Sequence, residues 1–113
     1  MTRALGGFEE LVLLALLRLD DGAFGVTVRR EIESRTGRET STGALYTTLE
    51  RLESRGLISA ELGSSTPARG GRRRKRYAMT ERGMEALRDS FDAYRSMVRG
   101  MEARLAPADG EGA

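Results

Sequence analysis

The residues best suited to chemistry in this sequence form one basic run. Six of the eight residues from 69 to 76 are positively charged and none is acidic, whereas the whole chain of 113 residues has a net charge of only +2. The rest of the chain therefore sums to −4. Such a concentration of positive charge is typical of an electrostatic contact with a phosphate backbone. The run consists of Arg69, Gly70, Gly71, Arg72, Arg73, Arg74, Lys75 and Arg76.

Two glycines, Gly70 and Gly71, stand beside the clustered arginines. Glycine lets a loop approach a ligand closely, and arginine is favoured where a narrow minor groove deepens the negative potential. We therefore predict that residues 72–76 contact the DNA backbone or the minor groove. Because alternate side chains of a strand point to opposite faces, only some of these residues would face DNA. A solvated loop, or a surface for an acidic protein partner, is the alternative interpretation.

The composition argues against an enzyme. The chain has no histidine and no cysteine, so the commonest general base, metal ligand and thiol nucleophile are missing. The acidic pairs Glu9-Glu10 and Asp20-Asp21 have no other catalytic residue types converging on them, and we interpret them as surface. We expect no catalytic residue, no metal site and no cofactor. No apolar run approaches the roughly 20 residues of a membrane span, so we expect a cytoplasmic protein.

The residues from 42 to 55 predict a helix with one apolar and one polar face. Ser41 or Thr42 suits its N-terminal cap, and Gly56 suits a left-handed end. The apolar face carries Leu45, Leu49 and Leu52.

The polar face of this helix resembles that of a recognition helix, which enters the major groove by its N-terminal half. Thr47 suits a thymine methyl group or a phosphate, Tyr46 a phosphate, and Arg51 either a guanine edge or the backbone. An ordinary solvated helix face is the alternative. The residues predicted to contact DNA here are Ser41, Thr42, Gly43, Tyr46, Thr47 and Arg51.

The order of the elements around this helix predicts a winged helix-turn-helix domain. A short amphipathic helix over 27–36, ended by Gly37, comes before it. Strand candidates at 57–62 and 73–79 follow, separated by a flexible, polar loop over 63–71. Together the strands form a hairpin with a long basic tip, which is the wing.

Two further helices predict self-association. The segment 8–19 is apolar on nearly every side, so we expect one face to pack in its own domain and the other against a second subunit. A last helix over 80–105, capped by Thr80, carries apolar residues alternately three and four apart, which is an uninterrupted heptad seam. The residues predicted to form a homodimer are Leu13, Leu17, Met84, Leu87, Phe91, Tyr94, Val98, Met101 and Leu105.

Alternatives for the heptad residues are an intramolecular core or, for Phe91 and Tyr94, an effector pocket at the dimer interface. We divide the chain into a DNA-binding domain over 1–79, a dimerisation helix over 80–105 and a disordered tail over 106–113. The predicted fold class is mainly α, of the α+β kind, with a winged helix-turn-helix and a C-terminal coiled-coil-like helix.

Several motifs together resemble the PadR family of bacterial transcriptional regulators, in its short form with a single dimerisation helix. They are Gly43-Ala44-Leu45-Tyr46, Leu49, Arg51-Leu52, Gly56-Leu57-Ile58, Gly70-Gly71-Arg72, Lys75, Tyr77 and the segment from Thr80 to Gly83. The chain departs from the family at Gly25-Val26, where an aromatic residue commonly follows the glycine, and in its longer wing loop.

The resemblance implies a homodimeric repressor that binds an inverted-repeat operator in double-stranded DNA and releases it when an effector or stress signal arrives. It identifies no particular small-molecule effector. The alternative function is a dimeric winged-helix adaptor that binds an acidic protein partner through its basic wing.

Overall fold

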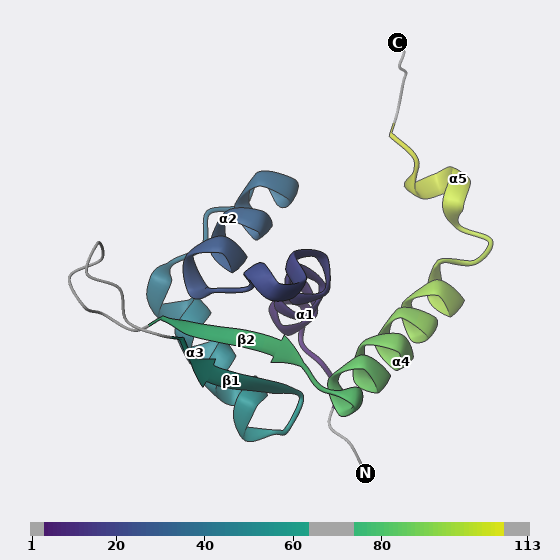
Figure 1. The fold of residues 1–113 in the computed structure, drawn as a ribbon. Coiled ribbons are helices and arrows are strands. Elements are labelled where there is room, and N and C mark those ends of the chain that lie inside the picture. The colour runs from purple at the N-terminus through teal and green to yellow at the C-terminus, as the bar shows by residue number, and fades with distance from the viewer. Residues whose placement is uncertain (1–3, 64–73, 108–113) are drawn as a thin grey trace.

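The computed structural model describes residues 4–63 and 74–107 and has the predicted mainly helical fold with a two-stranded wing (Figure 1). Three helices come first, a hairpin follows them, and a long helix then leads away from the domain. The elements are α1 (Gly7–Leu19), the short 3-10 turn η1 (Asp20–Gly22), α2 (Gly25–Thr36), α3 (Thr42–Ser54), β1 (Ile58–Leu62), β2 (Lys75–Met79), α4 (Glu81–Val98) and α5 (Glu102–Leu105).

Helix α1 is the centre of the core, since it contacts α2, α3, α4 and β2. Its Val12 and Leu13 are completely buried. Apolar side chains from every neighbouring element close around them, and burial of this kind is the main force that stabilises a small domain. The partners in the core include Val28, Ile32, Leu45, Leu49, Leu52, Leu57, Ile58, Tyr77 and Leu87.

The predicted helix ends are confirmed at four positions. The Ser41 hydroxyl accepts a hydrogen bond from the Ala44 N–H (3.1 Å), and the Thr80 hydroxyl accepts one from the Gly83 N–H (3.1 Å). Gly37 and Gly56 have φ values of 72° and 77°, in the left-handed region that favours glycine. These local signals fix where α2, α3 and α4 begin or end.

The wing is an antiparallel hairpin in which Ile58 is opposite Met79 and Leu62 is opposite Lys75. Each strand begins one or two residues later than predicted. Leu57 still donates its N–H to the Leu52 carbonyl (3.0 Å), so it belongs to the end of α3. On the other edge of β2, Phe24 forms an isolated antiparallel bridge with Arg76. The segment before α2 therefore supports the base of the wing.

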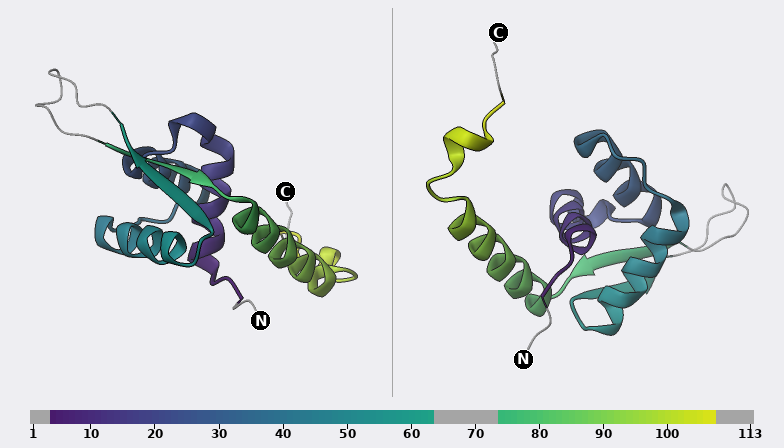
Figure 2. Two further views of the ribbon diagram at one scale, coloured as in Figure 1. Left: turned by 60° about the horizontal axis from the view of Figure 1, so that its bottom comes forward. Right: turned by 180° about the vertical axis from the view of Figure 1, so that it is seen from behind.

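The prediction of one helix and an uninterrupted seam over 80–105 is wrong beyond Val98. Helix α4 ends there, and Gly100 has a φ of 88°. Glycine is a poor helix former and readily adopts this left-handed conformation. The Gly100 N–H also donates to the Glu102 carboxylate (2.9 Å), which closes the turn before α5. As a result α5 departs from the axis of α4 (Figure 2), and the predicted seam residues Met101 and Leu105 lie beyond the end of that helix.

Candidate nucleic-acid interface and apolar groove

The N-terminal half of α3 presents small polar residues to solvent. Thr42, Gly43 and Thr47 are exposed on its outer side. Ser41 has a structural task as well, since its side chain caps the helix. The Thr42 hydroxyl accepts a long hydrogen bond from Arg29 of α2 (3.3 Å), which links the two helices of the helix-turn-helix. This end of α3 is therefore accessible and held in place.

Tyr46 packs directly on Gly25, the first residue of α2. A Cβ at position 25 would overlap the Tyr46 hydroxyl and ring, so only glycine fits beneath this tyrosine. Tyr46 is still 39% exposed. Its hydroxyl therefore lies at the N-terminus of α2, where backbone N–H groups and the helix dipole favour an anion.

Arg51 forms an ion pair with α1, although it lies one turn after Thr47 on the same face of α3. Its Nη1 lies 3.8 Å from an oxygen of Glu9, and Arg55 Nη1 lies 3.3 Å from the other oxygen. The Glu9 side chain is 9% exposed and also accepts the Gly6 N–H (2.8 Å). The interpretation of Glu9 as a surface residue is therefore wrong. It connects the start of α1 to the end of α3.

Three cations at the base of the wing have contacts within the domain. The Arg74 guanidinium lies over the Phe24 ring, 4.1 Å from its centroid, and the Lys75 ammonium lies 3.8 Å from Glu53. Arg76 donates to Glu61 (2.9 Å), and this carboxylate raises the pKa of Arg76 above its usual value. The predictions for the rest of the basic run lie outside the described residues; they concern Arg69, Gly70, Gly71, Arg72 and Arg73.

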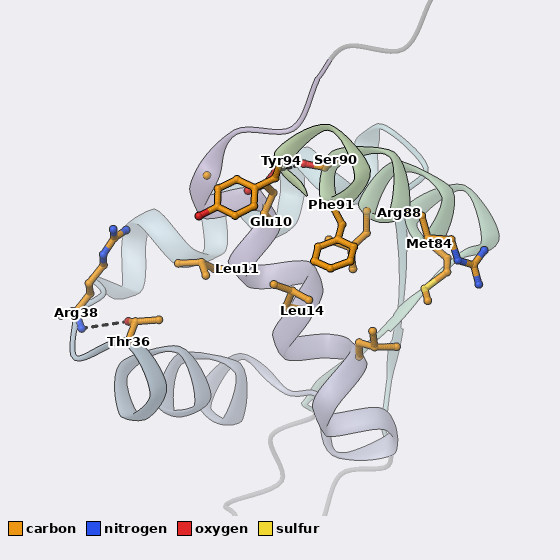
Figure 3. Close-up of a pocket in the computed structure, with 13 residues that line it drawn as sticks. Glu10, Leu11, Leu14, Thr36, Arg38, Met84, Arg88, Ser90, Phe91 and Tyr94 are labelled. Atoms are coloured by element: carbon orange, nitrogen blue, oxygen red, sulfur yellow. Dashed lines mark hydrogen bonds between the residues drawn. The ribbon is translucent and has the colours of Figure 1, made fainter. Parts of the chain in front are cut away.

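A second feature is an apolar groove of about 810 Å³ between α1 and α4 (Figure 3). Phe91 and Tyr94 on α4 lie across from Leu11 and Leu14 on α1. The Ser90 hydroxyl donates to the Glu10 carboxylate and so connects the two helices along the groove. Large apolar side chains lining a surface groove are typical of an interaction site.

The structure corrects part of the predicted dimer set. Leu13 is completely buried and Leu87 is 7% exposed, so both belong mainly to the core of the protomer. Leu17, Phe91 and Tyr94 are exposed to 43%, 56% and 67%. Leu14, which the sequence reasoning missed, is exposed to 43%. Its spacing of three from Leu11 and Leu17 places it on the same face of α1, but in a helix apolar on nearly every side the spacing does not show which face is exposed.

The family model of the PadR-like transcriptional regulators matches residues 13–89. This match covers α1 from its middle, the whole helix-turn-helix, the wing and the first half of α4. The chain belongs to the PadR-like family. It is thus a DNA-binding transcriptional regulator and not an enzyme, and the resemblance is confirmed. No curated protein matches the chain significantly.

Solved structures support the assignment to the PadR-like family. A PadR family transcription regulator from Clostridium difficile R20291 is 25% identical with a TM-score of 0.71, over 88% of this chain and 100% of that one. A PadR family regulator from Eggerthella lenta DSM 2243 is 28% identical with a TM-score of 0.66, over 84% and 80%. A PadR-like regulator from Bacillus cereus, at 24% identity and a TM-score of 0.67 over 90% and 93%, supports the fold alone.

Two further observations concern the described parts of this PadR-like chain. Across residues 4–63 and 74–107, no helix has the length and apolar character required to cross a membrane. Over the same ranges, no three acidic side chains gather into a group able to hold a metal ion.

Proposed function

We propose that this PadR-like regulator is a homodimeric repressor that binds an inverted-repeat operator and is released from it by an effector. One observation carries the proposal. The exposed N-terminal half of α3 and the cationic base of the wing belong to one domain, in which α3, the wing and the segment before α2 are joined by direct contacts. A helix for the major groove and a flanking basic hairpin are the two parts that a winged helix-turn-helix protein needs.

In this proposal the start of α3 enters the major groove. Thr47 and Thr42 contact base edges or phosphates, Gly43 permits a close approach, and the Tyr46 hydroxyl donates to a phosphate near the start of α2. Ser41 lies at the same end. Arg51 contacts the backbone at the flank of the groove if its ion pair with Glu9 opens. The run from Arg69 to Arg76 contacts the backbone or the minor groove.

A second copy of the chain is the proposed occupant of the apolar groove. Leu14, Leu17, Phe91 and Tyr94 expose enough apolar surface that its burial would favour association. A two-fold dimer presents two α3 helices, which matches half-sites about one helical turn, or roughly 34 Å, apart. An effector that binds beside Phe91 and Tyr94 would alter the spacing of the two helices. Because its proposed target is chromosomal DNA, we place the protein in the cytoplasm.

Selection of bound sequences from a random duplex pool tests the proposal. We expect an enriched inverted repeat with half-sites about 10 base pairs apart, bound by two chains, and an affinity that falls as salt rises. A matched pool of single-stranded DNA provides the control. Weak binding that shows no enriched sequence at any salt concentration would contradict operator recognition and favour the protein-partner alternative.

A further inference from the structure

The base of the wing contains three cations in very different electrostatic situations. Lys75 and Arg76 each face a carboxylate, Glu53 at 3.8 Å and Glu61 at 2.9 Å. Each of these two charges thus has an ion-pair partner within the protein, although both pairs are exposed to solvent. Arg74 differs, because within the described residues no hydrogen bond or ion pair engages its side chain.

The contact that Arg74 does make leaves its donors available. A guanidinium stacked on an aromatic ring uses the face of its plane, while its five N–H groups point outward within that plane. The Arg74 Cζ atom lies over the Phe24 ring, 4.1 Å from its centre, which is a close cation–π contact. Phe24 therefore restricts the orientation of Arg74 without using any of its hydrogen bonds.

The backbone of Phe24 is itself fixed. Its N–H donates to the Thr27 hydroxyl (2.9 Å), and its carbonyl accepts the Val28 N–H (2.8 Å). Its bridge with Arg76 and the neighbouring hydrogen bond from the Tyr77 N–H to the Ala23 carbonyl (2.8 Å) join it to β2. Phe24 thus makes two contacts with the wing. Its backbone pairs with Arg76, and its ring contacts the Arg74 guanidinium.

The position of Arg74 in the hairpin makes this support important. The Arg74 carbonyl accepts the Gly63 N–H (2.8 Å) just beyond the paired strands. A long side chain at such a site normally loses rotamer freedom when it binds a ligand, and that loss weakens binding. Because the Phe24 ring has already restricted the side chain, less freedom remains to be lost.

We propose that Phe24 is a positioning residue for DNA binding, which holds the Arg74 guanidinium as a preorganised phosphate contact at the base of the wing. The inference deepens the proposed function and rests on it. It also predicts a ranking among the wing cations, with Arg74 contributing more to affinity than Lys75 or Arg76. Sequence reasoning had no means of ranking them.

A double-mutant cycle on the selected operator duplex tests the inference. Phe24→Leu in the otherwise natural chain should weaken binding by about two- to tenfold, the range expected for a cation–π stack or one immobilised side chain. Arg74→Gln should weaken it at least as much. In the Arg74→Gln background, Phe24→Leu should have almost no further effect, because the group it positions has gone. Phe24→Trp, in contrast to Phe24→Leu, should keep the affinity of the natural protein, since it retains an aromatic face beneath Arg74.

The matched control is Lys75→Gln, which removes a neighbouring charge already paired with Glu53 and should change affinity much less than Arg74→Gln. If Phe24→Leu weakens binding equally in both backgrounds, its role is structural only and the inference is overturned. The inference is also overturned if Lys75→Gln lowers the affinity for the operator as much as Arg74→Gln does.

A second measurement does not depend on the folding of any variant. In the natural protein, the Arg74 side-chain protons should show upfield ring-current shifts and nuclear Overhauser contacts with the Phe24 ring. If these shifts and contacts are absent, Arg74 does not lie on the Phe24 ring and the inference is overturned. A natural protein that binds no duplex sequence would refute the proposed function itself, whereas binding without coupling between the two residues would refute only this inference.

Discussion

The ring of Tyr46 occupies the space where any side chain at Gly25 would stand. This contact joins the N-terminal half of α3 to the first turn of α2, and it fixes both the spacing of the two helices and the position of the Tyr46 hydroxyl. It also explains why the residue that opens α2 is glycine although its φ is not positive. The requirement is for space, not for backbone freedom.

Gly25→Ala should therefore destabilise the protein, although alanine is the better helix former. We expect a loss of about 1–3 kcal/mol, typical of overpacking, and a lower melting temperature in calorimetry. Tyr46→Ala in the Gly25→Ala background should recover part of that loss by making room. If Gly25→Ala raises the melting temperature, helix propensity dominates and the contact has no energetic role.

Glu9 gives a second prediction, because it is a nearly buried carboxylate that faces two arginines of α3. Glu9→Gln keeps the shape and an acceptor for the Gly6 N–H but removes the charge. We expect a loss of about 1–3 kcal/mol in denaturant unfolding, since charged partners in a partly buried site are then poorly compensated.

The control for this change is Glu39→Gln, an exposed carboxylate for which the described residues provide no ion-pair partner. It should change the free energy of unfolding by less than about 0.5 kcal/mol. Equal effects of the two substitutions would show that Glu9 acts only through the net charge of the chain.

The sequence predicted the features that depend on neighbouring residues. Ser41, Thr80, Gly37 and Gly56 act within one turn of the helix that they begin or end, so their types alone indicated the boundaries. The same holds for the hairpin, whose two paired strands were indicated by the turn-forming residues between them in the sequence. The order of these elements then limited the fold to a winged helix-turn-helix.

Features that depend on distant residues were not predictable in the same way. Helix α1 is apolar on nearly all sides, so periodicity did not decide that Leu13 is in the core while Leu14 is exposed. Arg51 was assigned to DNA from its place on α3, and only the packing of α1 brings Glu9 beside it. The heptad spacing predicted a helix that continues through Gly100, but this glycine adopts a left-handed conformation and the helix ends before it.

The apolar groove gives a prediction on assembly. Phe91→Glu should convert a dimer into monomers in sedimentation. Its carboxylate would be buried where the second chain is proposed to occupy the groove between α1 and α4. Met97→Glu is a matched control on the same helix, since Met97 is 80% exposed and does not line the groove. A Phe91→Glu protein that stays dimeric would place the interface elsewhere.

Glu31 gives a prediction on pH. The pKa of the Glu31 carboxyl is lowered below 4.5. The main cause is the hydrogen bond from Arg35, and the positive charges of Arg35 and Arg18 add to it. A group whose pKa is lowered on folding stabilises the protein above its unfolded pKa, and that stabilisation is lost as the pH falls through the folded value. Glu31→Gln should therefore lower the melting temperature slightly at pH 7, and its difference from the natural protein should shrink as the pH falls below 4.5. A difference independent of pH would exclude the ion pairs as its cause.

Base recognition by α3 gives the last prediction. Thr47 is exposed one turn from Gly43, in the half of the helix proposed to enter the major groove. Thr47→Ala removes a hydroxyl and a methyl group, so the preference for one base pair per half-site should weaken by about 1–3 kcal/mol in a selection from randomised operators. Ser54→Ala, at the far end of the same helix, should leave the selected sequence unchanged. If Ser54→Ala relaxes the sequence and Thr47→Ala does not, the C-terminal end of α3 contacts the bases, and the proposed orientation of the domain on DNA is reversed.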